Sequence, residues 1–355
     1  MWARLQRLQS KLASQGLEGL VVVQPENRRY LSGFSGSEGV LLILTDKAYL
    51  CTDFRYVEQA AKQTTGWEIV KVDTAWPEVV KLLWPKDRRK LGFEAQYLSY
   101  DGWHKLSQLL PAINLVPTSG LVETLRIQKD GQELALLRQA IALADKGAEF
   151  LRTCLSPDRT EKEVALELEF FLRDQGSEGA AFPFIVASGA RGSLPHGEPG
   201  DKKLRQGELA TIDFGAIYQG YHSDLTRTFS LGPPTPKQEA IYEIVLAAQS
   251  KAIACAGPGV RCAEVDQAAR DVIASAGYGD FFGHATGHGV GLAIHEAPRL
   301  SPRAGTDVLL SGTVVTVEPG IYIPGWGGVR TEDVILITDQ GAEVLSQAPK
   351  DAFIL

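Results

Sequence analysis

The chain has 355 residues, of which 44% are hydrophobic and 22% charged, so it is long enough for two domains of ordinary globular composition. Its formal net charge of −7 argues against general binding to nucleic acids or to anionic membranes. The longest apolar run near the N-terminus, Val40 to Leu44, is far too short to cross a membrane, and no signal peptide is recognised, so we expect a cytoplasmic protein. The four cysteines form no CxxC pair, and we expect buried free thiols.

The first 125 residues alternate helix-like and strand-like segments. Leucines recur at helical spacing within the first twenty residues, and residues 56–63 also have the pattern of a helix. Three further segments are typical of strands, namely residues 19–23, 39–44 and 67–72. We therefore predict a mixed α/β domain over residues 1–125.

A domain boundary is predicted near residue 125, because proline, serine and glycine punctuate residues 117–120. Beyond the boundary, residues 132–154 have the pattern of a long amphipathic helix. A second helix is predicted from Thr160 to Gln175, with Thr160 and Glu163 spaced as in a capping box. Five of the six histidines lie beyond the boundary, so we place the chemistry in residues 126–355.

Residues 209–229 read LATIDFGAIYQGYHSDLTRTF, which predicts a hairpin with two β-rich runs around a Tyr-Gln-Gly turn. If Tyr218–Gln219 is the loop, Asp213 lies directly opposite Asp224; if Gln219–Gly220 is the loop, the two are diagonal neighbours. Either register places both carboxylates on one face, with Cβ atoms about 5–8 Å apart. Unpartnered like charges are destabilising there, so we expect a cation between them.

A second hairpin is predicted over residues 313–338, with a turn rich in proline and glycine around Gly325. Glu318 and Glu332 are symmetric about Gly325, so they can also face each other. Pro319 predicts a strand end or a bulge directly after Glu318. Either hairpin alone could carry solvated acids, but two such hairpins with a histidine cluster favour a pair of divalent cations of the manganese, cobalt, iron or zinc kind.

The histidine cluster lies in residues 284–298, HATGHGVGLAIHEAP. Its glycines disfavour a helix by roughly 1 kcal/mol each, and the HExxH motif of zinc peptidases is absent. In a flat strand His288 and His295 would face opposite ways, because they are seven residues apart. We therefore expect an extended segment that bends at the glycines and brings both to one site. His196, in the turn-rich GSLPHGEPG, would on its own be an ordinary solvated histidine.

Six motifs resemble those of the pita-bread metallopeptidases, in family order and within residues 194–333. They are LPHG (194–197), TIDFGA (211–216), SDLTRT (223–228), GHGVGLAIHE (287–296), VEPGIY (317–322) and GVRTED (328–333). The chain is most similar to the Xaa-Pro branch of aminopeptidase P and prolidase. The resemblance implies a C-terminal pita-bread catalytic domain over residues 126–355 and a smaller creatinase-type N-terminal domain over residues 1–125, together an α/β (α+β) fold.

The resemblance implies a dinuclear metal site, with manganese as the first expectation. The five implied ligands are Asp213, Asp224, His288, Glu318 and Glu332. Asp224 and Glu332 would bridge the two ions, and Glu318 would also act as the general acid/base.

Other site residues are implied in the same way. His196 and His295 match catalytic histidines that contact the substrate carbonyl or the oxyanion. His284, Tyr322 and Arg330 match residues that support the site or contact substrate, and Arg330 could pair with a carboxylate or with the peptide. Proline lacks a backbone N–H and must be recognised by shape, so an apolar pocket is expected, with Phe182 and Phe184 as candidates.

The implied function is hydrolysis of the peptide bond before proline at a free N-terminus. We expect the aminopeptidase P type, which releases the first residue from longer peptides, with the dipeptide-specific prolidase type as the alternative. A metal-free creatinase-like hydrolase and a non-catalytic binding module are disfavoured because all five ligand positions are intact. A homodimer is expected by analogy.

Overall fold

The computed structural model describes residues 2–350 and 354, and the chain divides into two compact units between Arg126 and Ile127. The predicted boundary at residue 125 lies one residue before this division. All four cysteines are free thiols; three are buried and Cys255 is half-buried. No helix within the described residues is both long and apolar enough to span a membrane.

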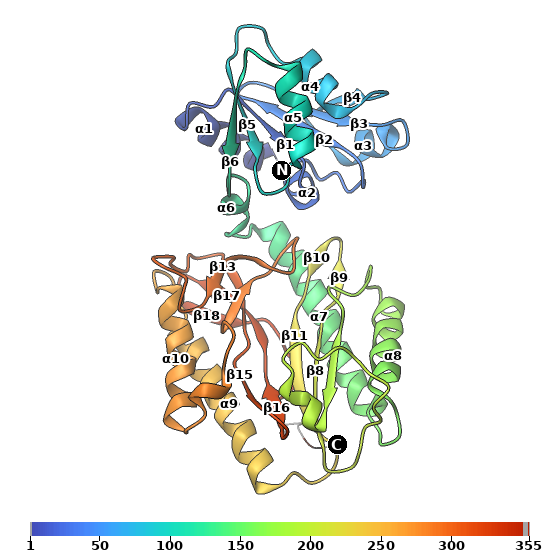
Figure 1. Ribbon diagram of the computed structural model, residues 1–355, viewed down its shortest axis with the longest axis vertical. Coiled ribbons are helices and arrows are strands. Elements are labelled where there is room, and N and C mark those ends of the chain that lie inside the picture. Colours follow the sequence, from blue (N-terminus) through green and yellow to red (C-terminus); the bar gives the residue numbers. More distant parts are fainter. Residues whose placement is uncertain (1, 351–353, 355) are drawn as a thin grey trace. The chain divides into compact units, whose positions relative to one another are not determined.

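The N-terminal unit is built on a six-stranded mixed sheet in the order β4-β3-β2-β1-β5-β6 (Figure 1). Its strands are β1 Gly19–Val22, β2 Val40–Leu44, β3 Ala48–Thr52, β4 Glu68–Lys71, β5 Lys90–Glu94 and β6 Asn114–Thr118. Its helices are α1 Trp2–Ser14, α2 Pro25–Ser32, α3 Val57–Gln63, α4 Trp76–Leu83, α5 Tyr100–Leu109 and α6 Glu123–Arg126. The predicted mixed α/β domain is confirmed.

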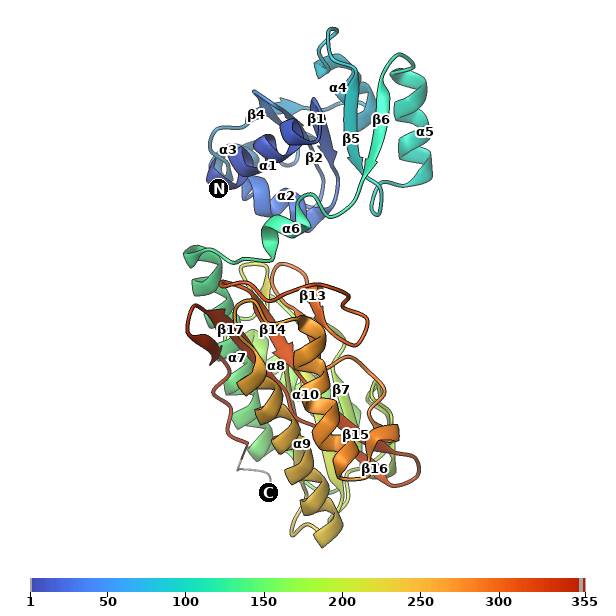
Figure 2. The ribbon, with the colours of Figure 1, turned by 90° about the vertical axis from the view of Figure 1, so that its left-hand side faces the viewer.

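Both faces of this sheet are covered by helices. Val80 of α4 and Leu106 of α5 pack against one face, together with Val21 and Leu42. Figure 2 shows α1 on the other side of the strands, where its predicted leucine stripe is fully buried. Alternate side chains of β1 and β2 therefore enter two different apolar layers, which explains why these strands read as continuous hydrophobic runs.

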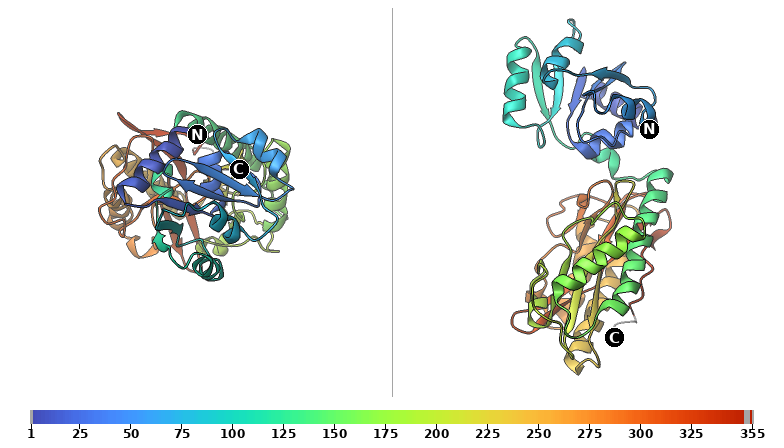
Figure 3. Two further views of the ribbon diagram at one scale, coloured as in Figure 1. Left: turned by 90° about the horizontal axis from the view of Figure 1, so that it is seen from above. Right: turned by 90° about the vertical axis from the view of Figure 1, so that its right-hand side faces the viewer.

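The second unit consists of two half-sheets, each covered by a pair of helices. The first half-sheet has the order β11-β8-β7 and the second β13-β12-β14-β17-β18, with two small ladders, β9–β10 and β15–β16. The right-hand view of Figure 3 shows α7 and α8 in front of the strands, whereas α9 and α10 are in front in Figure 2. This is the layered α+β arrangement that the resemblance implies.

The elements of this unit have the following bounds. The helices are α7 Gly131–Cys154, α8 Glu161–Asp174, η1 Gly189–Ser193, α9 Pro236–Cys255, α10 Cys262–Ser275 and η2 Gly279–Phe281. The strands of the first half are β7 Ile185–Ser188, β8 Leu209–Phe214, β9 Ile217–Tyr218, β10 Tyr221–His222 and β11 Leu225–Ser230. Those of the second half are β12 Gly287–Gly289, β13 Glu296–Leu300, β14 Val314–Val317, β15 Gly320–Ile323, β16 Gly327–Arg330, β17 Asp333–Thr338 and β18 Gly341–Val344. The predicted capping box of α8, between Thr160 and Glu163, is present.

The first hairpin adopts the second of the two predicted registers. Thr226 pairs with Asp213, and the loop is Gln219–Gly220. Both loop residues have positive φ, 45° and 75°, as a type I′ turn requires. Asp224, directly before β11, is therefore the diagonal neighbour of Asp213 on the same face.

The second hairpin is long and interrupted, and it keeps one register throughout. Val317 pairs with Asp333 in the β14–β17 ladder, and Gly320 pairs with Arg330 in the β15–β16 ladder, so both ladders are symmetric about Gly325. Glu318 and Glu332 lie in the gap between the two ladders. Pro319, which cannot donate a ladder hydrogen bond, follows Glu318 at that gap as predicted.

The histidine stretch bends as predicted. The ladder between β12 and β13 shifts register between His288 and Gly289, and the rings of His288 and His295 then meet edge to face, with centroids 4.3 Å apart. Gly287 is required because a Cβ atom there would lie 1.9 Å from the carbonyl oxygen of Thr316 in β14. The glycines therefore allow both a close strand approach and the bend.

We predict that Gly287→Ala lowers the free energy of unfolding by about 1–3 kcal/mol, because β12 must move away from β14 to admit the methyl group. Urea unfolding of the full chain measures this loss. Gly283→Ala is the matched control, since a Cβ atom at Gly283 would have no neighbour within 4 Å. Equal stability of the two variants would contradict the prediction.

Candidate metal centre

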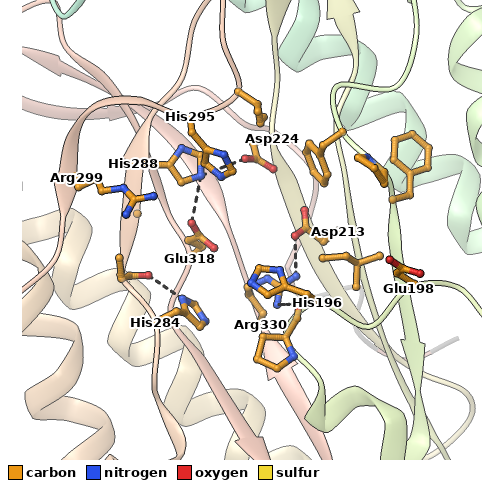
Figure 4. A pocket seen from close by; sticks show the side chains of 18 residues that line it. His196, Glu198, Asp213, Asp224, His284, His288, His295, Arg299, Glu318 and Arg330 are labelled. Atoms are coloured by element: carbon orange, nitrogen blue, oxygen red, sulfur yellow. Dashed lines mark hydrogen bonds and ion pairs between the residues drawn. The ribbon is translucent and has the colours of Figure 1, made fainter. Parts of the chain in front are cut away.

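Three carboxylates from different elements converge where the two half-sheets meet. Oxygens of Asp213, Asp224 and Glu332 all lie within 4.8 Å of one another. Asp213 comes from β8, Asp224 from the residue before β11, and Glu332 from the gap between β16 and β17. His288 and Glu318 adjoin this cluster: His288 Nε2 lies 3.5 Å from both Asp224 Oδ2 and Glu318 Oε1 (Figure 4). All five predicted ligands are thus brought together.

The imidazole of His288 has the orientation of a metal ligand. Its Nδ1 lies 3.0 Å from the carbonyl oxygen of Gly289, which can only accept, so Nδ1 carries the hydrogen and Nε2 presents a lone pair. Burial lowers the pKa of His288 to about 4, which keeps the ring neutral. The Nε2 lone pair and the two nearby carboxylate oxygens repel one another. A cation bound among the three atoms would attract all of them.

The carboxylates themselves also fit divalent cations. Asp213 Oδ1 and Glu332 Oε1 are buried and accept no hydrogen bond within the described chain. Burial, and then the charge of neighbouring carboxylates, raises the pKa of Asp224 and of Glu332 well above the usual range, and burial raises the pKa of Glu318 to about 8. A divalent charge would satisfy the two orphaned oxygens and keep the carboxylates ionised.

Arg330 pairs with a carboxylate, which resolves the alternatives left open by its sequence context. Its Nη2 donates to Asp213 Oδ2 at 2.7 Å, its Nε donates to Thr226 Oγ1 at 3.0 Å, and its Nη1 donates to the Tyr322 hydroxyl at 2.8 Å. Thr226 in turn donates to Glu332 Oε2 at 2.7 Å. Arg330 therefore holds one oxygen of Asp213 and leaves the other directed into the cluster.

Tyr322 and His284 extend this network. His284 Nδ1 lies 2.8 Å from the carbonyl oxygen of Ala285 and must donate to it, so Nε2 accepts from the Tyr322 hydroxyl, also at 2.8 Å. Burial lowers the pKa of His284 to about 4, consistent with this neutral form. Both ring nitrogens are thus occupied within the protein, and Tyr322 lies behind His284 and Arg330 instead of lining the cavity. Tyr322 thus links His284 to Arg330, and the contact of these two residues with substrate stays a prediction.

A cavity of about 470 Å³ opens onto the cluster. His196 and His295 line it, as do Phe182 and Phe184. The ring of Phe184 also packs edge to face on Phe214, with centroids 6.0 Å apart, so it belongs to the core of the first half as well. The side chains predicted to surround a substrate therefore share one space.

Two charged residues in this cavity, Arg299 and Glu198, were missed by the sequence reasoning. Arg299 is exposed and is the cross-strand partner of His288 (Figure 4). Its guanidinium forms no ion pair or hydrogen bond with any residue in the described part of the chain, unlike that of Arg330. The β12–β13 pairing would have revealed it, because a residue opposite His288 must lie beside the cluster.

We predict that Asp224→Asn has opposite effects on stability with and without metal. Because folding raises the pKa of Asp224, its stabilising contribution is complete below its unfolded value, about 4, and is lost as pH rises through the folded value. Without metal at pH 8, Asp224→Asn should have a higher free energy of unfolding than the native sequence, because the asparagine buries no charge. Manganese at a hundredfold excess over Kd should stabilise the native sequence by about 2.7 kcal/mol. The native sequence should then be the more stable of the two.

Urea unfolding between pH 5 and 8, in chelator and in manganese, measures both effects. The stability difference in chelator should shrink as the pH falls. A difference that does not vary with pH, or that keeps its sign in manganese, would contradict the prediction.

Comparisons with known proteins agree with this fold and indicate its family. Residues 135–339 match the model of Metallopeptidase family M24, and residues 4–128 match the Creatinase/Prolidase N-terminal domain. The Xaa-Pro dipeptidase of Pyrococcus furiosus is 38% identical over 353 residues, which cover 99% of each chain. Among solved structures, the Xaa-Pro dipeptidase from Bacillus anthracis is 45% identical with a TM-score of 0.95, covering 100% of this chain and 99% of its own. The X-Pro aminopeptidase from Thermotoga maritima is 35% identical with a TM-score of 0.89 and 99% of both chains covered.

Family membership implies divalent metal ions, in agreement with the orphaned oxygens of Asp213 and Glu332. The half-sheets and their helix pairs form the pita-bread domain, preceded by a creatinase/prolidase-type domain. The chain therefore belongs to metallopeptidase family M24.

Proposed function

We propose that this protein is an Xaa-Pro dipeptidase that uses two divalent cations, with manganese the first candidate, held by the five predicted ligands. This replaces our expectation of an aminopeptidase P type by its alternative. Relatives named Xaa-Pro dipeptidase, similar over the whole chain, support the change. The neighbour from Thermotoga maritima, named an X-Pro aminopeptidase, supports the other activity, so a property of the cavity has to distinguish the two.

That property is the unpaired guanidinium of Arg299. In a dipeptide the C-terminal carboxylate lies one residue beyond the scissile bond, whereas in a longer peptide an uncharged amide occupies that place. Arg299 lies in the same cavity as Asp213 and His288, and a carboxylate can pair with its fork of N–H donors. A cation without a partner in the cavity wall favours an anionic substrate end over a neutral one.

The chain's own side chains supply the remaining chemistry. When bound, the two cations lower the pKa of water and polarise the carbonyl group before proline. Glu318 takes the proton of the attacking water at a carboxylate oxygen and delivers it to the leaving proline nitrogen. Its orientation is set by Thr316, whose hydroxyl donates to Glu318 Oε1 at 3.3 Å, and by its own N–H, which donates to the Thr286 carbonyl at 2.7 Å.

The histidines and aromatic rings in the cavity wall orient the substrate. His295, held edge to face against His288, and His196 on the opposite loop donate hydrogen bonds to the carbonyl oxygen as negative charge develops on it. Phe182 offers a half-buried apolar face for a substrate side chain or the proline ring, which has no N–H to recognise.

We predict that Arg299→Met lowers kcat/KM for an Xaa-Pro dipeptide by about 10- to 100-fold, because a charge-assisted hydrogen bond contributes about 1.5–3 kcal/mol. The loss should appear mainly in KM. The same dipeptide with a C-terminal amide is the matched control substrate, and its turnover should be low and nearly unchanged by the substitution. An equal loss for acid and amide, or faster cleavage of Xaa-Pro-Xaa than of Xaa-Pro by the native sequence, would favour the aminopeptidase type.

We predict that Glu318→Gln reduces kcat by at least about 100-fold, because loss of a general acid/base costs about 10²–10⁴-fold. The amide keeps the shape and the hydrogen bond from Thr316 but cannot carry the proton. The circular dichroism spectrum should match that of the native protein, which shows that the fold is kept. Turnover within tenfold of the native value would contradict the role given to Glu318.

A further inference from the structure

A series of hydrogen-bonded polar side chains, here called the polar chain, lies behind Glu318 and Glu332. It connects the backbone directly before Glu318 with the backbone of Glu332. It runs from Val317 through Gln249, Lys350, Asp333 and Arg227 to the carbonyl group of Glu332. The cavity does not include these linking side chains. Their arrangement therefore needs an explanation other than contact with substrate.

One arm of this chain reaches Glu318. Gln249, fully buried on α9, donates from Nε2 to the carbonyl oxygen of Val317 at 3.1 Å, and Val317 directly precedes Glu318. The other end of the same amide, Oε1, accepts from Lys350 Nζ at 3.1 Å. Because β14 ends at Val317, no ladder partner continues past this point, and the amide of Gln249 holds the last carbonyl group of the strand.

The other arm reaches Glu332. Lys350 Nζ also donates to Asp333 Oδ2 at 2.6 Å, and Asp333 Oδ1 accepts from Arg227 Nη2 at 2.8 Å. Arg227 Nη1 then donates to the carbonyl oxygens of Glu332 and of Thr226, which belong to different half-sheets. This arm therefore holds Glu332 against the strand that follows Asp224.

Lys350 is the member that joins the two arms. The side chains of Arg227 and Asp333 are only 2% and 1% exposed, whereas that of Lys350 is 32% exposed. Its position is fixed by the Tyr242 hydroxyl of α9, which donates to the Lys350 carbonyl oxygen at 2.6 Å. The lysine can thus be changed without opening a cavity in the core.

We propose that Lys350 is a positioning residue of the metal centre, which sets the spacing of Glu318 and Glu332 by holding the backbone beside each of them. This inference rests on the metal-ligand roles in the proposed function. Groups that orient metal ligands typically change metal affinity by about 10- to 100-fold when removed. Because Lys350 acts through the backbone, we expect an effect near the lower value.

The test compares Lys350→Met, Lys350→Arg and the control Lys251→Met in the full chain. Lys251 is an exposed lysine on the same helix as Gln249, so its loss changes the net charge equally without touching the polar chain. Calorimetric titration of chelator-stripped protein with manganese chloride measures Kd, and thermal unfolding in chelator measures the stability of the metal-free fold. We expect Lys350→Met to weaken manganese binding about tenfold and to lower kcat with little change in KM. Lys350→Arg should restore most of both, and Lys251→Met should resemble the native protein.

Lys350→Met with a native manganese Kd would overturn the proposal, and so would a lower melting temperature in chelator without a change in Kd. An equal loss of manganese affinity in Lys251→Met would show that the effect comes from the change in net charge, and would also overturn the proposal. If the native protein binds manganese but does not cleave Xaa-Pro peptides, the proposed function fails while the Kd comparison still decides the role of Lys350. Absence of manganese binding by the native protein would overturn both.

Discussion

Mutual repulsion among four closely spaced carboxylates is the constraint on which the catalytic unit depends. Oxygens of Asp213, Asp224 and Glu332 lie within 4.8 Å of one another. Glu318 adjoins them, because His288 Nε2 lies 3.5 Å from both Asp224 and Glu318. Like charges so close, largely out of water, destabilise the fold unless cations or protons compensate them. One oxygen of Asp213 is compensated by Arg330, and the orphaned oxygens remain directed to where metal ions would bind.

The architecture places these charges on chain segments that cannot easily move apart. Each half-sheet has its own apolar core under its own helix pair, and the seam between the halves is polar. Across that seam, Thr226 and Arg330 link carboxylate to carboxylate, while Arg227 links backbone to backbone. The two apolar cores therefore stabilise the unit, and the polar contacts between the half-sheets fix the relative positions of the predicted metal ligands.

The cavity also contains polar and charged groups that do not belong to the predicted metal-ligand set. Arg330 donates to the Tyr322 hydroxyl, and that hydroxyl donates to His284, so these three side chains are linked to one another within the protein. Arg299, the cross-strand partner of His288, lines the cavity without an ion pair to any described residue, and it is the cation that we propose for a substrate carboxylate. One arginine is thus part of the scaffold and the other is unpaired within the described part of the chain, although both line the same cavity.

Much of the acidic site could be predicted from local sequence patterns, because the spacing of two residues in a strand determines whether they lie on the same face. The side chains of a strand alternate, so two acids in a hairpin symmetric about its turn must share a face, and Gly325 determined that symmetry for Glu318 and Glu332. In the first hairpin parity left two registers open, and positive φ at Gln219 and Gly220 selected one. The glycines around His288 likewise indicated a bend but not its partner strand.

The sequence by itself therefore determined the mixed α/β character of the N-terminal domain and both acidic hairpins. With the family resemblance it also determined the α+β class and the membership in the M24 peptidases. Only the tertiary structure decided which arginine pairs with Asp213 and how both ring nitrogens of His284 are bound. It also decided that Arg299 faces the cavity and that Lys350 joins the polar chain between the backbone next to Glu318 and that of Glu332. These are contacts between segments far apart in the chain, such as 117 residues for Arg330 and Asp213. Residue spacing constrains neighbours within one ladder, whereas contacts across the seam depend on how two separate cores come together.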